Sequence, residues 1–154
     1  MPTLACPDLG GFDFREEEIL DFPDGLPAFE TLRRFVLARR DEFAPFMFLI
    51  SVDSPAVRFI CVPVFLLDPD YRFELAVGDE TAAGLEAGTY AAASGNLLLL
   101  AIVTLPNSAP ATANLASPVV VDARRRSGVQ VILPGDTHSH VTPLRPRAVV
   151  EESC

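Results

Sequence analysis

The sequence lacks the features on which several classes of protein depend. Its 154 residues contain no lysine, so all 12 basic side chains are arginine, and 21 acidic residues bring the formal net charge to −9. Binding to nucleic acids rests on the neutralisation of phosphates by basic side chains, and binding to anionic membranes needs the same charge. The charge balance therefore argues against both partners. It favours a basic protein partner, which a negative surface attracts over a long range.

Cysteine is scarce, and the apolar runs are short. Cys6, Cys61 and Cys154 form no C-x-x-C pair, and an odd, scattered set is not a disulfide framework. Residues 97–105 form an apolar run of nine residues, whereas a membrane-spanning helix needs about 20. The first eleven residues hold no basic residue and no apolar stretch of signal-peptide length. These absences predict a protein of the reduced cytoplasm, with no membrane partner.

Short β-strands explain most of the apolar pattern. Residues 97–105 have no polar position at helical spacing, so they predict a strand that is buried on both faces in the middle of a sheet. Residues 46–52 are apolar, aromatic and β-branched and predict a second buried strand. Residues 71–77 alternate between apolar and polar side chains, as in a half-exposed strand. Residues 119–133 predict a hairpin.

The whole pattern predicts a mainly β domain of about eight to ten short strands with one or two short helices. One helix is predicted over residues 29–35, where large apolar side chains recur at every third position. Another is predicted over residues 79–86, which begin with a capping residue and good helix formers.

The composition also predicts where the domain begins and ends. Residues 1–10 are expected to form a loose arm, and residues 11–134 a single domain. Residues 135–154 are polar and rich in proline, and we expect them to form a tail.

No motif of a known active site or nucleotide site occurs. The sequence has no G-x-x-x-x-G-K-[ST], no G-x-G-x-x-G and no G-x-S-x-G, so we expect no cofactor. His138 and His140 would project to one side of an extended segment, as two metal ligands do, and Asp136 is close enough to add a carboxylate. A metal site and an exposed tail are the two interpretations of this segment. Cys61 falls in register with apolar positions and is predicted to be a buried structural thiol.

Acidic residues gather around one predicted strand. Asp68, Asp70 and Glu74 flank the aromatic residue Tyr71. General acid–base catalysis needs two carboxylates in different environments, whereas an acidic rim around an aromatic anchor suits a protein partner. These four residues are therefore candidates for partner binding, and solvated surface charge is the alternative.

Asn114 is a polar residue in an apolar setting, between Ala113 and Leu115. Its side-chain amide can form hydrogen bonds with the backbone of a neighbouring turn. A structural role of this kind and a contact with a partner are the two interpretations of Asn114.

Six segments follow one another along the chain in an order that can be compared with known families. They are F-P-D-G-L-P-A-F-E (22–30), D-S-P-A-V-R-F (53–59), D-P-D-Y-R-F-E-L (68–75), A-I-V-T-L (101–105), T-A-N-L-A-S-P-V-V-V-D (112–122) and R-S-G-V-Q-V-I-L (126–133). In this order the segments resemble the flagellar assembly factor FliW family, and the resemblance covers about residues 11–133.

The resemblance implies a small β-barrel-like fold without catalytic activity. It implies a cytoplasmic protein that binds the translational repressor CsrA and relieves its block on flagellin mRNA, without direct contact with nucleic acid. It also implies binding to flagellin, so that unassembled flagellin competes for the protein. Two alternatives remain open: a secretion chaperone that binds flagellin alone, and a small metal-dependent hydrolase that uses His138 or His140.

Overall fold

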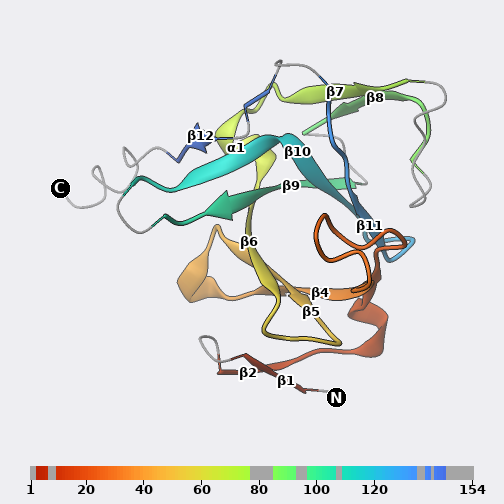
Figure 1. Ribbon diagram of the computed structural model, residues 1–154, viewed down its shortest axis with the longest axis vertical. Helices are drawn as coiled ribbons and strands as arrows, with labels where there is room; N and C mark the ends of the chain where they lie inside the picture. The colour runs from red at the N-terminus through yellow and green to blue at the C-terminus, as the bar shows by residue number, and fades with distance from the viewer. Residues whose placement is uncertain are drawn as a thin grey trace.

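The computed structural model has a mainly β fold (Figure 1). The described residues are 3–6, 10–76, 85–92, 97–106, 109–134, 138–139 and 141–144. In chain order the elements are β1 (Thr3–Cys6), β2 (Gly10–Asp13), the 3₁₀ turn η1 (Glu16–Glu18), β3 (Leu20–Asp21), β4 (Arg34–Arg39), the 3₁₀ turn η2 (Asp41–Phe43), β5 (Met47–Ser51), β6 (Arg58–Pro63), α1 (Val64–Leu67), β7 (Arg72–Leu75), β8 (Gly88–Ala91), β9 (Leu97–Thr104), β10 (Thr112–Asp122), β11 (Ser127–Gln130) and β12 (Thr142–Pro143).

The main sheet closes on itself. Its strands follow the order β11-β3-β4-β5-β6-β9-β10, and β10 pairs again with β11, which closes a barrel of seven strands within the described residues. The pair β11–β3 is parallel and the other pairs of this ring are antiparallel. The predicted mainly β, barrel-like domain is confirmed, and the parallel pair makes its sheet a mixed one.

Strand β9 lies at the centre of this arrangement. It pairs with β6 on one side and with β10 on the other. Its side chains alternate between two cores, with Leu98 and Leu100 inside the barrel and Leu99 and Ala101 on the outer face. A strand that is covered on both faces is apolar at every position. The predicted central, doubly buried strand is therefore confirmed.

The barrel interior is filled by large side chains. Its buried members are Leu20, Phe22, Leu26, Phe35, Leu49, Cys61, Leu100, Val119 and Val121. The rings of Phe22 and Phe35 meet edge to face, with 5.1 Å between their centroids, which is a favourable geometry for aromatic pairs. An added Cβ at Gly128 would overlap the Phe22 ring, so glycine at this position leaves the space that the ring fills.

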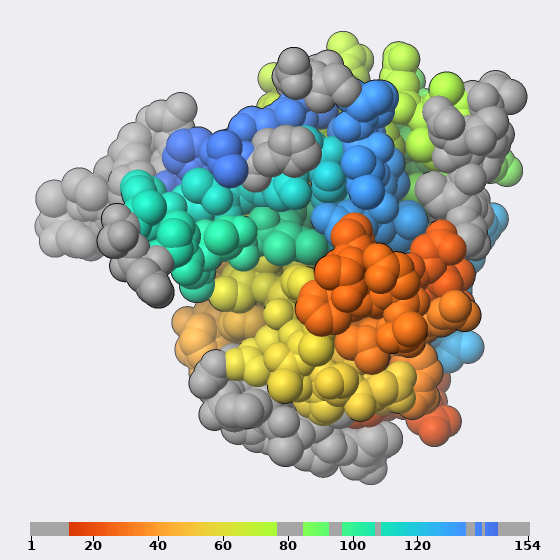
Figure 2. Space-filling model, viewed as in Figure 1, coloured from red at the N-terminus to blue at the C-terminus, as the bar shows by residue number. Residues whose placement is uncertain are grey.

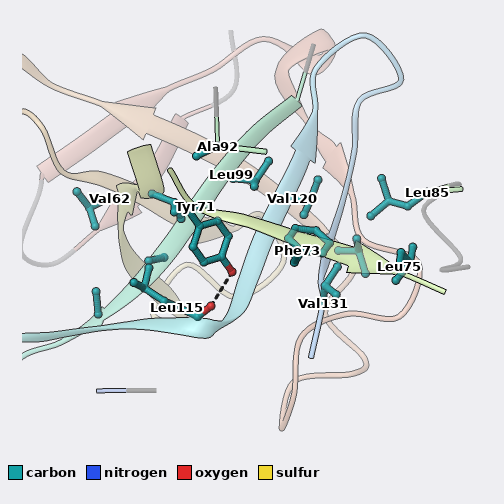
Figure 3. Close-up of a cluster of buried hydrophobic side chains, with 14 of the residues drawn as sticks. Val62, Tyr71, Phe73, Leu75, Leu85, Ala92, Leu99, Leu115, Val120 and Val131 are labelled. Atoms are coloured by element: carbon teal, nitrogen blue, oxygen red, sulfur yellow. Dashed lines mark hydrogen bonds between the residues drawn. The ribbon is translucent and has the colours of Figure 1, made fainter. Parts of the chain in front are cut away.

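Two antiparallel strand pairs pack outside the barrel in the part of the chain that is described (Figure 1). The pair β7–β8 covers the outer face of β9 and β10, and this contact buries a second core (Figure 3). In the view of Figure 1 the pair β1–β2 lies below β5. Directly after β2, Phe14 packs with Val36 and Ile50 in a third, smaller cluster.

The helix predicted over residues 29–35 is not formed. Phe29 closes a bridge with Leu26, and β4 begins at Arg34. The turn in between directs Phe29 onto Phe59 of β6, with 5.7 Å between the ring centroids, and the segment lies against β6 on the surface (Figure 2). The threefold spacing therefore reflects packing of a turn on the barrel, not helical periodicity. The other predicted helix, over residues 79–86, falls mostly outside the described residues.

The helix α1 stands where no helix was predicted, directly after β6. No helix in the described ranges is long and apolar enough to cross a membrane. The predicted division into arm, domain and tail stays a prediction, although Thr3–Cys6 is paired with β2 and Thr142–Pro143 with the start of β10.

Candidate protein-binding surface

The helix α1 presents two large apolar side chains to solvent. Val64 is fully buried, and Leu67 packs on the second core outside the barrel, the outer core. Both side chains point the same way because residues three apart share one face of a helix. Phe65 and Leu66 point the other way and are 45% and 50% exposed. The sequence did not predict this helix, because V-F-L-L resembles the end of a strand. A proline before it and an aspartate after it were the available signals of a short helix.

The loop after α1 is held by local hydrogen bonds. The backbone N–H of Asp68 donates to the Val64 carbonyl oxygen at 2.9 Å, and the Tyr71 N–H donates to the Asp68 carbonyl oxygen at 3.0 Å. The Asp68 carboxylate oxygen Oδ1 accepts from the Asp70 N–H at 3.0 Å. This is the turn that short acidic side chains favour, and it fixes the direction of the loop.

Tyr71 lies in the core and not at the surface. It is 1% exposed, and its hydroxyl donates to the Leu115 carbonyl oxygen at 2.6 Å (Figure 3). Burial raises the pKa of the Tyr71 hydroxyl, and the nearby Asp68 carboxylate raises it further. The role of aromatic anchor for a partner, predicted for Tyr71, does not fit this position, since the ring is already enclosed by the protein's own side chains.

The predicted acidic residues do lie at the surface of the same segment. Asp70 and Glu74 are exposed, and Asp68 is half-buried. In β7 the apolar side chains face the core, while Arg72 and Glu74 face outward. The predicted half-exposed strand is confirmed. The arrangement leaves carboxylates around a rigid loop whose aromatic residue points inward.

His138 supports this loop from the side. Its ring lies over the Tyr71 ring with 4.3 Å between centroids, and its Nε2 is 2.9 Å from the Arg72 carbonyl oxygen, within hydrogen-bonding distance. The neighbouring Ser139 carbonyl oxygen accepts from the Leu115 N–H at 2.9 Å. His140 and Asp136 lie outside the described residues. Within those that are described, no group of three or more metal-ligating side chains comes together.

Asn114 has the structural role that was one of its two interpretations. Its Oδ1 accepts from the N–H groups of Ala116 and Ser117, at 3.0 and 3.1 Å. These bonds bridge an irregularity in the pairing of β10 with β9, where the register shifts between Asn114 and Val119. A β-bulge leaves backbone groups without ladder partners, and the amide supplies an acceptor for two of them. A partner contact by Asn114 stays a prediction.

Cys61 is the buried structural thiol that the sequence predicts. It is 0% exposed inside the barrel, and burial raises its thiol pKa to about 12. A thiol with such a pKa stays protonated near neutral pH and is a poor nucleophile.

One mouth of the barrel forms a cavity of about 810 Å³. Its floor is made by leucine and valine side chains of β3, β4, β9 and β10, and its rim holds charges of both signs. The charged rim residues are Asp13, Glu17, Glu18, Arg39 and Arg126. The rim therefore carries three carboxylates and two guanidinium groups.

The sequence matches one protein family over most of its length. A family model described as FliW protein matches residues 4–144. The flagellar assembly factor FliW of Caldanaerobacter subterraneus is 33% identical over 143 residues, which cover 92% of this chain and 91% of that protein. The flagellar assembly factor FliW of Carboxydothermus hydrogenoformans is 34% identical over 134 residues, which cover 86% and 83%.

The fold matches the same family. A crystal structure of the flagellar assembly factor FliW superposes with a TM-score of 0.78 at 28% sequence identity. The match covers 94% of this chain and 98% of that one. Sequence and fold thus indicate the same family over nearly the whole of this chain.

Proposed function

Because this chain belongs to the FliW family of flagellar assembly factors, we propose that it binds a CsrA-type translational repressor and relieves the repression of flagellin mRNA. It also binds flagellin, and unassembled flagellin competes with the repressor for it. In this role the protein acts in the cytoplasm by binding alone, without catalysis and without contact with RNA.

The acidic surface at the loop before β7 is the observation that carries this proposal. Asp68 and Asp70 present carboxylates on a loop that is fixed from beneath, and Glu74 presents one on the outward face of β7. An RNA-binding repressor carries basic side chains for phosphate contacts, so its surface complements a chain with a net charge of −9. Binding of the protein next to the RNA site would couple the two equilibria, as allosteric linkage requires.

The alternative of a hydrolase gains no support from the described residues, to which His140 does not belong. The His138 ring and the Tyr71 hydroxyl are both used in contacts that hold the loop, and these contacts serve the structure. A chaperone that binds flagellin alone remains the alternative, and the two functions differ in one measurable property.

The test measures binding of the purified chain to the CsrA-type repressor and to the flagellin of its own organism, by calorimetry. We expect both to bind with dissociation constants of about micromolar or tighter, and each to displace the other. Binding of flagellin without the repressor would establish the chaperone alternative. Binding of neither would overturn the proposal.

A triple variant tests the acidic surface. Asp68→Asn keeps the acceptor oxygen of the turn, while Asp70→Lys and Glu74→Lys reverse two exposed charges. We expect about tenfold weaker binding of the repressor, because each lost charge pair at the edge of an interface costs a fraction of a kcal/mol. The matched control is Glu16→Gln with Glu17→Lys and Asp24→Lys, an equal change of charge on exposed residues of other elements. An equal loss in both variants would show that the contact lies elsewhere.

A further inference from the structure

We propose that Phe65 and Leu66 of α1 form one docking surface with Asp68 and Asp70, and that this surface binds a basic protein segment. The segment presents a large apolar side chain next to arginine or lysine. We call these four residues the α1 surface. The inference rests on the proposed function and names the chemistry of the partner at that site.

The exposed apolar pair lies outside the buried contacts of α1. The helix attaches to the outer core through Val64 and Leu67, so polar side chains at positions 65 and 66 would leave this attachment intact. Single exposed apolar residues are common on protein surfaces, but two large ones side by side on one helical turn are a feature of interaction sites. Burial of these two side chains on binding removes apolar surface from water, which favours the complex.

The α1 surface is preorganised from beneath. Val64 is 0% exposed, and the Tyr71 hydroxyl ties the far end of the loop to β10 through the Leu115 carbonyl oxygen. The Asp68 side chain fixes the turn in between by accepting from the Asp70 N–H. A partner therefore meets a loop that these hydrogen bonds hold in place, which lowers the entropic cost of binding.

Charge complementarity selects the partner. Asp68 and Asp70 follow the apolar pair after Leu67, and Glu74 lies on the outward face of the next strand. Arg72 shares that face with Glu74, so the segment carries three carboxylates against one guanidinium. An apolar anchor with an acidic edge fits a partner whose own apolar side chain is flanked by basic ones. An anionic lipid surface or RNA would be repelled by the same carboxylates.

The test uses the CsrA-type repressor of the same organism as the probe. In the double variant Phe65→Ala with Leu66→Ala we expect at least about tenfold weaker binding, seen mainly as faster dissociation, because apolar contacts are lost and no charge changes. The matched control is Leu105→Ala with Ile132→Ala, which removes two apolar side chains that are 62% and 67% exposed. We expect the control to bind like the unmodified protein.

A second variant separates the two parts of the α1 surface. Asp68→Asn with Asp70→Asn keeps the oxygen acceptor of the turn and removes the charge, so it should slow association and weaken its dependence on salt. Leu66→Gln alone, which leaves Phe65 in place, should give an intermediate loss of affinity.

The outcomes distinguish the inference from the function on which it rests. Unchanged affinity in the Phe65→Ala, Leu66→Ala variant would overturn the α1 surface while the proposed function stands. An equal loss in that variant and in the Leu105→Ala, Ile132→Ala control would also overturn it. Failure of the unmodified protein to bind the repressor would overturn the proposed function, and the inference with it.

Discussion

The acidic neighbours of Tyr71 in the sequence led to a wrong prediction of where its side chain lies. It stands among acidic residues, which predicted a surface anchor, yet its ring is buried and its hydroxyl bonds to the Leu115 carbonyl oxygen. The alternation of residues 71–77 correctly placed Tyr71, Phe73 and Leu75 on one face. Alternation does not state which face is covered by the core. The buried face of β7 is decided by its packing on the outer face of β9 and β10, and these strands come later in the chain.

The Tyr71 hydrogen bond can be tested by removal of one oxygen. We expect Tyr71→Phe to lower the free energy of unfolding by about 1–3 kcal/mol, because a buried carbonyl oxygen loses its donor. Urea unfolding measures this change. The matched control is Tyr90→Phe, whose hydroxyl donates to the Glu86 carbonyl oxygen at 2.6 Å in an exposed setting, where water can replace it. An equal effect in both variants would contradict the importance of burial.

At the scale of elements, short-range patterns predicted strands better than they predicted helices. The buried strand over residues 46–52 corresponds to β5, and the hairpin over residues 119–133 to β10 and β11. The helix over residues 29–35 failed because a threefold spacing arises equally in a turn that packs on a barrel. The helix α1 was missed because a single helical turn is too short for its periodicity to be read.

The bulge in β10 depends on one side chain, and this gives a second prediction. Asn114→Ala removes the acceptor of the Ala116 and Ser117 N–H groups, both on buried residues. We expect a loss of about 1–3 kcal/mol in the free energy of unfolding, since buried donors without partners are costly.

The control for this prediction keeps the acceptor oxygen. Asn114→Asp retains a carboxylate oxygen at the same position, so near neutral pH it should retain most of the stability that Asn114→Ala loses. Thermal unfolding of the two variants gives the comparison. A stable Asn114→Ala protein would mean that the bulge is held by the strand pairs on either side of it.

At the scale of the whole molecule, the family and its barrel-like fold were predictable through the resemblance, whereas the strand pairing that closes the barrel was not. Six segments in order indicated the family, and their residues lie on the strands and turns of the barrel and its outer layer. Closure depends on the parallel pairing of Ser127 with Asp21, which joins two strands that are far apart in the chain. Such a pairing leaves no local pattern, because both strands are short and each already has an antiparallel neighbour.

The negative charge of the whole molecule predicts how binding of the repressor depends on salt. A net charge of −9 attracts a basic partner over distances beyond contact, but salt shortens this range to about 10 Å at 0.1 M and about 3 Å at 1 M. The association rate should therefore fall about tenfold or more when salt rises from about 0.05 to 0.5 M, while the dissociation rate changes much less. Stopped-flow measurement separates the two rates.

The variant Asp68→Asn, Asp70→Lys, Glu74→Lys should show a weaker dependence of the association rate on salt than its matched control. The control carries an equal change of charge on Glu16, Glu17 and Asp24. The difference is expected because steering acts most strongly through charges next to the contact. Equal slopes in these two variants would assign the attraction to the net charge alone and not to the acidic loop.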